Sequence, residues 1–526
     1  MSWGSAMPSP SVFDPVLAAQ PDRLAIAAHE RGLDPAPPDG AAVLELACGD
    51  GANLLPLAYH RPGARFVGLE GAPGPARAAR ASAAALGLKN VEILEGGLEA
   101  LDGLAGRFDY VLVPGVLSTV SDGAADATVA TCARMLAPQG VAYVDHLGSA
   151  GMLLSQRLRE LLRRQVAAFD TVRERVERIR EILAVLDDDS LDMKQPHTVH
   201  ARLEVRFART LGDAALVGEV LSPYRRTYSP SELSGLLVRH GLEELAEAWD
   251  PSLERRGEAS LRRRLAPLTR GAPDAADLLE LMTGPRRRGV LVVRSGSRGS
   301  RASLRRGLLE RGAFAARLET RRDDILYEPT IEIAFATRSG AMVRTRDPLH
   351  KAVLATLRAA WPRGLSFQEL IDAATARLPG ALSGIPAPTP SDVERQAKEL
   401  LELHALDAVS WSSVHPPIET RVTEHPLVSP LTRWQAQRGH VLTDTQHRLV
   451  AVDELTRRLI GRLDGASTLA DLVRATRALF DTGELAYAPS SEAKRPSPDA
   501  LVKEALEGLA AADILIPGSS HLAAAE

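Results

Sequence analysis

Short apolar segments alternate with amphipathic segments between residues 41 and 146 of the chain. Continuous apolar segments are typical of strands buried on both faces, and the segments between them repeat apolar residues at helical spacing. The strand-like segments are 41–46, 64–70, 91–94, 108–113 and 140–146. Two more, 242–249 and 289–296, are expected to join the same sheet. This order predicts an α/β fold with a doubly wound, Rossmann-like sheet, which binds its ligand at the carboxyl ends of the strands.

A different pattern follows residue 146. From Met152 to Leu186 apolar residues recur three and four positions apart, which predicts one long helix. We expect this helical part, about residues 150–215, to be an insertion within an α/β domain that spans residues 1–297. The apolar side of the long helix requires burial, either as a lid over the ligand site or against a second subunit in a homodimer. The sequence leaves both arrangements open.

The remaining chain contains one helix–turn–helix outline twice, at 348–378 and at 453–480. In the first copy, Ser366 and Glu369 have the spacing of a capping box, which marks the start of a helix. These outlines predict two winged-helix-like α+β domains, a middle domain at 298–418 and a more helical C-terminal domain at 419–526. The second helix of the first copy is not basic, so a helix that reads DNA in a groove is not favoured.

Composition points to no charged partner. Lys and Arg number 63 against 67 Asp and Glu, a formal net charge of −4, which favours neither nucleic acid nor an anionic membrane. No apolar segment reaches the length of a membrane span, and residues 1–15 lack the charged and apolar regions of a signal peptide. The two cysteines, Cys48 and Cys132, cannot form a disulfide framework. We therefore expect a cytoplasmic protein.

The candidate chemistry begins with "VLELACGDGANL", Val43 to Leu54, where the first strand ends. Gly49 and Gly51 allow the backbone of this turn to approach a ligand closely. A dinucleotide site would need a third glycine, and Glu45 would repel a pyrophosphate at close range. Glu45 instead suits a cationic ligand, such as S-adenosylmethionine with its ammonium and sulfonium groups.

A second acid supports this interpretation. Glu70 ends the second strand about 20 residues beyond the glycines, where an acid accepts hydrogen bonds from the two hydroxyls of an adenosine ribose. Two acids on consecutive strand ends, with a glycine turn between them, favour a site for S-adenosylmethionine. The remaining alternative is a tight turn with two unrelated acids.

The same segments resemble the class I S-adenosylmethionine-dependent methyltransferases. This resemblance rests on "VLELACGDGANLLPLA", "GLKNVEIL", "FDYVLV" and "LAPQGVAYV". More narrowly, the chain is similar over nearly its full length to bacterial methyltransferases with a regulatory domain, the group that includes the rickettsial outer-membrane-protein lysine methyltransferases. The segments "LLELMTGPRRRGVLVVR" and "PLVSPLTRWQAQRGHVLTDTQHRLVAVDELTRRLIGRLDGASTL" carry this narrower resemblance.

The resemblance implies roles for residues around the methyl donor. Glu45 would face the ammonium of the methionine part, Glu70 would hold the ribose, and Gly97 with Leu98 would flank adenine. The implied cofactor-binding set is Glu45, Ala47, Cys48, Gly49, Gly51, Asn53, Glu70, Gly71, Gly97, Leu98 and Pro114, with Gly115 at the edge where the methyl group is transferred. Ala47 stands where family members commonly have glycine, which the turn tolerates if the φ of Ala47 is negative.

The acceptor side departs further from the family. Members often read H-G-V-Y-S-W, Y-N-T-Y-P-G-W and H-E-Y-L where this chain reads "PGVLSTV" (114–120), "DHLGSAGM" (145–152) and "GEVL" (218–221). The aromatic and histidine side chains that would surround a lysine ammonium are therefore largely replaced. We expect a protein side chain or a small molecule as the methyl acceptor, and methylation of lysine is not favoured.

Asp145 and His146 form the acid/base pair that we expect at this edge of the sheet. His146 is a candidate to take a proton from the nucleophile that receives the methyl group. The alternative, which the sequence favours, is that both side chains only bond to backbone at the strand end. His197 and His200 lack a third ligand with metal-site spacing, so we expect them in a solvated loop and predict no metal site.

Two functions of different class remain open. The first is an S-adenosylmethionine-dependent methyltransferase that acts on an N or O nucleophile of a protein side chain or a small metabolite. The second is a catalytically degenerate protein that keeps the methyltransferase fold and acts as a binding or scaffolding module.

Overall fold

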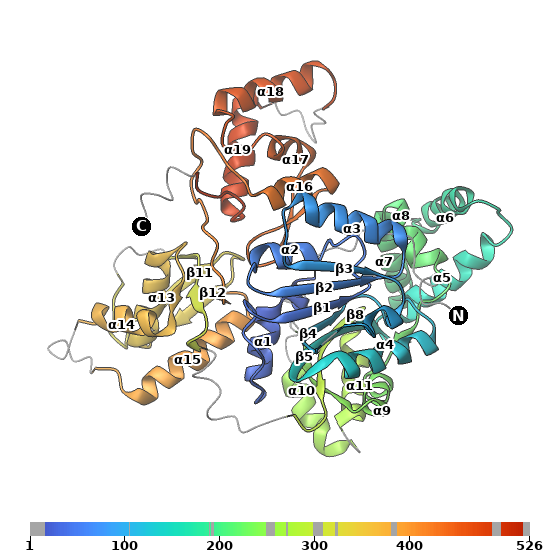
Figure 1. The fold of residues 1–526 in the computed structure, drawn as a ribbon, viewed down its shortest axis with the longest axis horizontal. Coiled ribbons are helices and arrows are strands. Elements are labelled where there is room, and N and C mark those ends of the chain that lie inside the picture. Colours follow the sequence, from blue (N-terminus) through green and yellow to red (C-terminus); the bar gives the residue numbers. More distant parts are fainter. Residues whose placement is uncertain are drawn as a thin grey trace.

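A mixed sheet of eight strands forms the centre of the molecule (Figure 1). The computed structural model describes residues 16–104, 106–188, 190, 194–248, 258–269, 272–297, 309–320, 325–379, 387–485 and 496–518, so the prediction about residues 1–15 lies outside it. The sheet has the order β3-β2-β1-β4-β5-β8-β7, and β6 pairs with the end of β5. Its strands are β1 (Ala42–Leu46), β2 (Arg65–Glu70), β3 (Val91–Glu95), β4 (Phe108–Val113), β5 (Leu136–Gly148), β6 (Thr227–Tyr228), β7 (Leu242–Glu247) and β8 (Arg287–Arg294).

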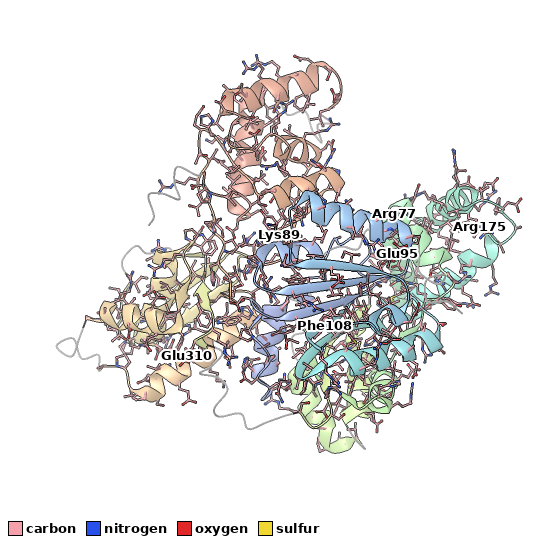
Figure 2. All side chains as sticks on the ribbon, viewed as in Figure 1. Arg77, Lys89, Glu95, Phe108, Arg175 and Glu310 are labelled. Carbon is pink, nitrogen blue, oxygen red and sulfur yellow. The ribbon has the colours of Figure 1, made fainter. Side chains whose placement is uncertain are left out.

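The first five strands run parallel, and the two late strands complete one edge of the sheet. β8 pairs antiparallel with β5, and β7 pairs antiparallel with β8. The predicted Rossmann-like sheet is therefore confirmed, including its two late strands. Figure 2 gives the strand direction, because Lys89 precedes β3 and Glu95 ends it. The carboxyl ends of the parallel strands face the part of the molecule where Arg175 is labelled, away from Glu310.

Helices cover both faces of the sheet, as alternation along the strands requires. Val43 of β1 packs in an apolar cluster on one face, and Leu44 and Leu46 pack in a second cluster on the other face. The first face carries α1 (Pro21–His29), α2 (Leu54–His60) and α3 (Pro73–Ala85), and the second carries α4 (Asp122–Met135) and α9 (Pro230–Arg239). Burial of each such Val or Leu side chain contributes about 1.5–3 kcal/mol to stability. α10 (Glu258–Leu265) and α11 (Ala272–Thr283) follow β7, and α11 packs against α9.

The helical insertion lies beyond the carboxyl ends of the strands (Figure 1). It contains α5 (Leu153–Gln165), α6 (Val172–Leu186), α7 (Pro196–Thr210), α8 (Asp213–Leu216) and a π-helical turn (Val217–Leu221). The prediction of one long helix from Met152 to Leu186 is wrong. Thr171 caps α6 and forms a capping box with Glu174, which starts a second helix. Both helices contribute to one apolar core, so the apolar spacing continues across the break.

The position of the two insertion histidines also corrects a prediction. His197 and His200 lie on α7 and not in a loop, and both are exposed. Pro196 occupies the first turn of that helix, a place that suits proline because the missing N–H has no helical partner there.

A middle unit follows the sheet domain. Its helices are α13 (Pro348–Ala360), α14 (Phe367–Arg377) and α15 (Pro390–Ala405). Its strands are β9 (Ala313–Ala315), β10 (Leu318–Glu319), β11 (Ile333–Thr337), β12 (Met342–Thr345), β13 (Leu365–Ser366) and β14 (Ser410–Ser412). Ser366 and Glu369 form the predicted capping box at the start of α14. The unit has its own apolar core, which includes the buried rings of Phe314 and Trp411.

A C-terminal unit completes the chain and packs beside α2 and α3 (Figure 1). It contains the hairpin of β15 (Val441–Thr443) and β16 (Leu449–Ala451), and the helices α16 (Pro430–Arg438), α17 (Glu454–Ile460), α18 (Leu469–Asp481) and α19 (Pro498–Ala511). These helices share a separate apolar core. Of the helices that the structure describes, none combines the length and the apolar character needed to cross a membrane.

Candidate active site

The turn after β1 lies at the carboxyl edge of the sheet, and its two glycines are buried. Gly49 and Gly51 have φ values of 57° and 87°, which lie in the left-handed region that suits glycine. A Cβ atom added at Gly51 would also lie 2.7 Å from the side chain of Leu55. The turn therefore requires glycine at Gly51 for two independent reasons.

Ala47 corrects an expectation about this turn. Its φ is +59°, so the residue adopts the left-handed region instead of the negative φ that its side chain prefers. The N–H of Cys48, the next residue, donates to the carbonyl of Leu69 at 3.0 Å and fixes the turn after Ala47 against β2. Residues 47, 49 and 51 all have positive φ, a conformation that glycine adopts most easily, which explains why glycine is common at position 47 in the family.

Glu70, at the end of β2, contacts the glycine turn directly. Its Oε2 accepts the N–H of Gly49 at 2.9 Å, and its Oε1 accepts the N–H of Ala72 at 2.7 Å. Burial raises the pKa of this carboxyl, and the backbone hydrogen bonds oppose that rise. The acid on β2 and the turn after β1 thus lie side by side, which is the arrangement that the sequence pattern predicts.

Glu45 lies below the turn, in the interior of the protein. Its Oε2 accepts a hydrogen bond from Nδ2 of Asn53 at 3.0 Å, and only 2% of Glu45 is exposed. Burial raises the pKa of Glu45 to about 8, because the single bond from Asn53 does not replace the lost hydration. A cation beside Glu45 would lower this pKa. The ionised form of Glu45 therefore needs a positively charged partner at this place.

The remaining residues of the implied cofactor set follow the ends of neighbouring strands. Gly97 and Leu98 come after β3, where Glu99 accepts the Gly97 N–H at 3.1 Å. Gly71 follows β2 and is partly exposed, whereas Pro114 follows β4 and is buried. The side chain of Cys48 points away from the turn, since a Cβ at Gly68 would lie 2.6 Å from its Sγ. Only the backbone of Cys48 is available to a ligand at the turn.

Asp145 connects the ends of β4 and β5. Its Oδ1 accepts the N–H of Gly115 at 2.7 Å, and its Oδ2 accepts the hydroxyl of Tyr143 at 3.2 Å. Arg287 on β8 lies 3.3 Å from the same Oδ2, and Asp145 is buried. These contacts give Asp145 a structural role at the strand end, as one of the two sequence interpretations proposed.

His146 differs from Asp145 because one of its ring nitrogens has no partner. Its Nδ1 lies 3.1 Å from the carbonyl of Leu147, so Nδ1 carries the proton of the neutral ring. Its buried Nε2 has no hydrogen-bond partner among the described residues. Burial lowers the pKa of His146 to about 4, so the imidazole is neutral at pH 7. The ring of Tyr228 packs edge-on against it at 5.8 Å.

A cavity of about 300 Å³ opens beside these two residues. Gly115, Asp145 and His146 line it from the sheet, and Met152, Phe207 and Glu219 line it from the insertion. Arg225, Arg286 and Arg287 also line the cavity; sequence reasoning did not select them. Arg225 pairs with Glu219, and Arg286 pairs with Glu204. No local sequence motif indicates these ion pairs, so sequence reasoning had no basis for selecting the arginines. The insertion therefore forms one wall of the cavity.

Two residues of the C-terminal unit reach the donor turn, and sequence reasoning missed both. Nε2 of His447 lies 2.9 Å from Oδ1 of Asn53, and Arg438 pairs with Asp50 of the turn. The polar segment "TDTQHR" between two short apolar runs does indicate a hairpin tip. That signal gives no information about where the tip docks, 394 residues along the chain from Asn53.

The described residues contain no group of three His, Cys, Asp or Glu side chains that is placed to hold a metal ion.

Two family descriptions match the chain. The family "Methyltransferase domain" matches residues 43–140, which include the glycine turn, Glu70 and the first four strands. The family "PKMT, C-terminal winged helix domain" matches residues 424–513, which include the hairpin and the last four helices. The chain combines a methyltransferase domain with a PKMT C-terminal winged-helix domain. The predicted resemblance is confirmed in these two regions of the chain.

Two proteins of Rickettsia prowazekii are similar to parts of the chain. The chain is 27% identical to the uncharacterized protein RP789 of Rickettsia prowazekii (strain Madrid E) over 233 residues, which are 44% of this chain and 42% of RP789. It is 25% identical to RP028 of the same organism over 190 residues, which are 36% of this chain and 76% of RP028. The match thus spans less than half the length of RP789.

The solved structure of PKMT2 from Rickettsia typhi in complex with AdoHcy shares the fold of this chain. The two superpose with a TM-score of 0.76 at 18% identity, over 97% of this chain and 100% of PKMT2. PKMT2 without that ligand gives a TM-score of 0.75. The common fold therefore extends beyond the two matched domains to nearly the whole chain.

The residues present at the methyltransferase edge suit S-adenosylmethionine. The ligand carries a positive charge, and the buried Glu45 lacks a charged partner among the groups that shift its pKa. Glu70 lies at the glycine turn with lone pairs remaining on both oxygens for ribose hydroxyls. Gly49 and Gly51, both with positive φ, have no side chains that would keep a ligand away from the backbone of the turn.

Proposed function

We propose that the chain transfers a methyl group from S-adenosylmethionine to an N or O nucleophile held in the cavity beside His146. One observation carries the proposal: the donor turn and the cavity lie on one edge of the sheet. Glu70 bonds to Gly49 on the β2–β1 side, and Asp145 bonds to Gly115 on the β4–β5 side, with β1 and β4 adjacent. A donor and an acceptor that bind at these two places are brought to one edge without a change of fold.

The donor side uses the residues that surround the glycine turn. Glu45 would face the ammonium and Glu70 the ribose hydroxyls, with Gly97 and Leu98 beside the adenine and Pro114 near the methyl group. When bound, S-adenosylmethionine supplies an electrophilic methyl group on its sulfonium, which an in-line nucleophile displaces. The task of the protein is to orient the two reactants and to exclude water.

On the acceptor side, the bare Nε2 of His146 accepts a hydrogen bond from the nucleophile. A hydroxyl or amine that donates to this lone pair has its own lone pair directed away from the histidine, toward the donor edge. When the nucleophile is a hydroxyl, its proton becomes strongly acidic once the oxygen has gained the methyl group, so a weak base with a pKa of about 4 can receive it. A methylated amine would instead keep the proton as an ammonium ion, whose pKa is about 10. His146 then loses the proton to solvent and returns to its neutral form. Asp145 keeps Gly115 and Arg287 in place and takes no part in proton transfer.

The lining of the cavity supports a polar acceptor. Three arginines and two carboxylates line it, and Phe207 supplies one aromatic ring. The ring of Phe207 already stacks on the guanidinium of Arg286 at 4.3 Å. A cage of aromatic rings for a lysine ammonium is not built from these lining residues. We therefore propose as the acceptor a hydroxyl or amine of a small metabolite or of a protein side chain other than a caged lysine.

The insertion is proposed to act both as a wall of the cavity and as a dimer contact. Its residues Met152 and Phe207 face the acceptor cavity. Val172 and Val185 of α6 are 56% and 76% exposed, and a second subunit of a homodimer would bury them. A cytoplasmic location is also proposed, and the two buried cysteines with free thiols support it.

Binding and transfer measured side by side test the proposed function. Calorimetry should detect binding of AdoHcy, and tritium from the labelled methyl group of S-adenosylmethionine should appear in at least one acceptor of a panel of phenols, hydroxy acids, amines and lysine peptides. His146→Ala should lower the transfer rate at least about 100-fold with unchanged AdoHcy affinity. His200→Ala, which changes an exposed histidine on α7, serves as the matched control.

Each failure has a distinct meaning. Absence of AdoHcy binding would contradict the proposed function. Binding without transfer to any acceptor would favour the binding or scaffolding module. Unchanged transfer by His146→Ala would remove His146 from the mechanism and leave the donor side intact.

A further inference from the structure

The tip of the β15–β16 hairpin, residues 444–448, is buried against the methyltransferase domain. Asp444 and His447 are 2% and 3% exposed, although hairpin tips usually lie in solvent. His447 also has a φ of +63°, a left-handed conformation that is uncommon for residues other than glycine. The contacts of this tip therefore require a physical explanation.

A chain of hydrogen bonds runs from the tip to the donor site. Nε2 of His447 lies 2.9 Å from Oδ1 of Asn53, and Nδ2 of Asn53 donates to Glu45 at 3.0 Å. The backbone N–H of Val16 also donates to Oδ1 of Asn53, at 2.8 Å. That second contact fixes the orientation of the Asn53 amide, because a backbone N–H cannot bond to an NH₂ group.

The direction of the chain follows from this orientation. Oδ1 of Asn53 only accepts, so Nε2 of His447 must carry a proton. Burial, with smaller contributions from Arg61 and His60, lowers the pKa of His447 to about 3, so the ring is neutral and Nδ1 is bare. His447 therefore donates to Asn53, and Asn53 donates to Glu45. Burial raises the pKa of Glu45, and the hydrogen bond from Asn53 opposes that rise.

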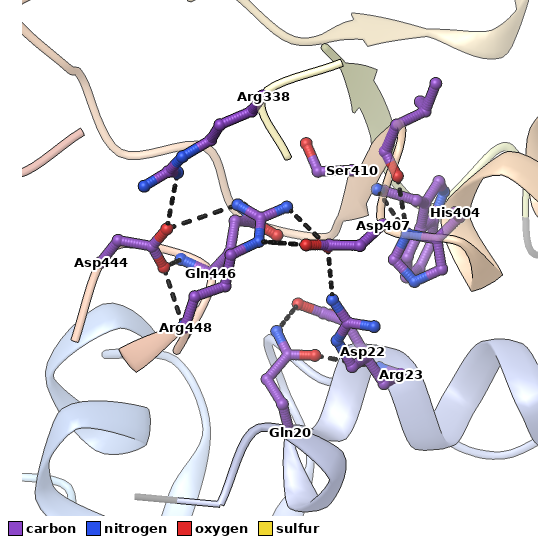
Figure 3. Close-up of polar contacts among 12 residues, drawn as sticks. Gln20, Asp22, Arg23, Arg338, His404, Asp407, Ser410, Asp444, Gln446 and Arg448 are labelled. Carbon is purple, nitrogen blue, oxygen red and sulfur yellow. Dashed lines mark hydrogen bonds and ion pairs between the residues drawn. The ribbon is translucent and has the colours of Figure 1, made fainter. Parts of the chain in front are cut away.

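Ion pairs from three parts of the molecule hold the hairpin tip in place (Figure 3). Arg448 lies between Asp407 of the middle unit, 2.9 Å away, and Asp444 of the hairpin itself, 3.4 Å away. Arg23 of α1 reaches the same Asp407 at 2.9 Å, and Arg338 reaches Asp444 at 3.1 Å. Because these pairs are largely buried, removal of one member leaves a charge without its partner. The residue next to Arg448 is His447, whose position is set by this network.

A second contact joins the same unit to the turn. Arg438, the last residue of α16, pairs with Asp50 between the two glycines of the turn, and its Nη1 lies 3.4 Å from the hydroxyl of Ser82 on α3. Two separate elements of the C-terminal unit thus contact the donor turn, one through Asp50 and one through Asn53.

We propose that His447 is a positioning residue of the donor site, so that the C-terminal winged-helix unit completes the site that binds S-adenosylmethionine. This inference rests on the proposed function, in which Glu45 faces the ammonium of the cofactor. His447 acts through Asn53, which directs and stabilises the carboxylate of Glu45. The methyltransferase domain without the C-terminal unit lacks this donor, and a change that withdraws the hairpin weakens the binding of the cofactor.

Two substitutions at His447 separate positioning from packing. His447→Leu fills a similar volume without a donor, whereas His447→Gln places an amide N–H at about the distance of Nε2. In calorimetric titrations of the full chain with AdoHcy, the leucine variant should bind about tenfold more weakly, a loss of about 1.4 kcal/mol. The glutamine variant should bind within about threefold of the unchanged protein. If the leucine variant does not fold, His447→Asn, whose shorter amide does not reach Asn53, provides the same comparison.

His350→Leu is the matched control for lost stability. His350 is also a buried histidine, and its Nδ1 lies 2.9 Å from Oε1 of Gln396, but it lies on α13 of the middle unit, outside the ion-pair network that holds the hairpin tip. This variant should lower the melting temperature and leave AdoHcy affinity unchanged. Equal affinities for the leucine and unchanged proteins would overturn the inference, as would equal losses for leucine and glutamine. Failure of the unchanged protein to bind AdoHcy would instead overturn the proposed function.

Discussion

The residues of the donor side lie close together in the sequence, whereas those of the acceptor side are far apart in the sequence. On the donor side, the turn 47–51 and Glu70 are within about one β-α-β unit of each other, and Glu70 bonds directly to Gly49. On the acceptor side, Asp145 meets Arg287, and the cavity wall comes from the insertion through Phe207. The donor side is thus a local motif, whereas the acceptor side depends on how separate segments pack.

Under the proposed function, the difference allows the donor side to stay the same while the lining of the acceptor cavity changes. Every donor contact of Gly49 and Glu70 involves backbone N–H groups and strand ends, which the fold itself positions. The acceptor cavity is lined by side chains whose ion pairs can be exchanged without moving a strand. His447 is an exception, because it belongs to a distant unit and yet serves the donor side. The predictions below test whether the two sides can be disturbed separately.

The largest effect is expected at Gly51. Gly51→Val places a β-branched side chain at a φ of +87° and against Leu55, so the turn must change shape. AdoHcy should bind at least about a thousandfold more weakly, a loss of about 4 kcal/mol, in calorimetric titrations. Gly87→Val is the control, because Gly87 has a φ of +67° and open space around it; this variant loses stability but not affinity. Similar loss of affinity in both variants would mean that the turn has no special role.

Asp145→Ala should disturb the acceptor side alone. The substitution leaves Arg287, the hydroxyl of Tyr143 and the N–H of Gly115 without their common acceptor, at a cost of about 3 kcal/mol in the free energy of unfolding. Urea unfolding should show this loss, while AdoHcy affinity stays within about threefold. Asp109→Ala removes one hydrogen bond, to the N–H of Ala42, and should cost about 1 kcal/mol. A large fall in AdoHcy affinity for Asp145→Ala would show that the two sides are coupled.

The pH dependence of cofactor binding should sharpen the role of Glu45. Its pKa of about 8 means that the acid is mostly protonated at pH 6 to 7, and a cationic ligand requires the ionised form. A lowered pKa in the complex makes binding release a proton, so AdoHcy affinity should rise by up to about tenfold per unit of pH in this range. The rise in affinity ends near pH 8, because Glu45 is then already ionised in the free protein and binding no longer releases a proton.

Glu45→Gln provides the comparison for this pH series. Glutamine keeps a hydrogen-bond acceptor for Asn53 but has no charge, so the affinity of this variant should be weaker at pH 7.5 and nearly independent of pH. Parallel pH profiles for the two proteins would place the ammonium elsewhere. The acceptor variant Asp145→Ala should retain the slope of the unchanged protein.

Much of the donor side was predictable from the sequence because it is local. Continuous apolar runs predict the strands, and the glycine turn between two acids places Glu45 and Glu70 near each other at neighbouring strand ends. The break in the insertion helix was missed because α5 and α6 keep one apolar spacing across it. His447 was missed because its partner lies 394 residues away and its own segment indicates only a hairpin. The contacts of Gly97, Leu98 and Pro114 with a cofactor stay predictions.

The smallest expected effect concerns Ala47, the one residue of the turn at which the backbone contradicts the expectation. A left-handed φ costs a residue with a side chain about 1–2 kcal/mol, whereas the greater freedom of glycine in the unfolded chain costs about 0.5–1 kcal/mol. Ala47→Gly should therefore raise the free energy of unfolding by about 0.5–1 kcal/mol in urea titrations.

Ala72→Gly is the matched control, because Ala72 also follows a strand end of the donor side but has a φ of −95° that alanine adopts without strain. It should lose about 0.5–1 kcal/mol, since only the entropy of the unfolded chain changes. Opposite signs for the two substitutions would show that the donor turn retains backbone strain where the family commonly has glycine. Equal losses would mean that the turn relaxes around Ala47, and the donor side would then be less rigidly determined by its backbone than the comparison with the acceptor side requires.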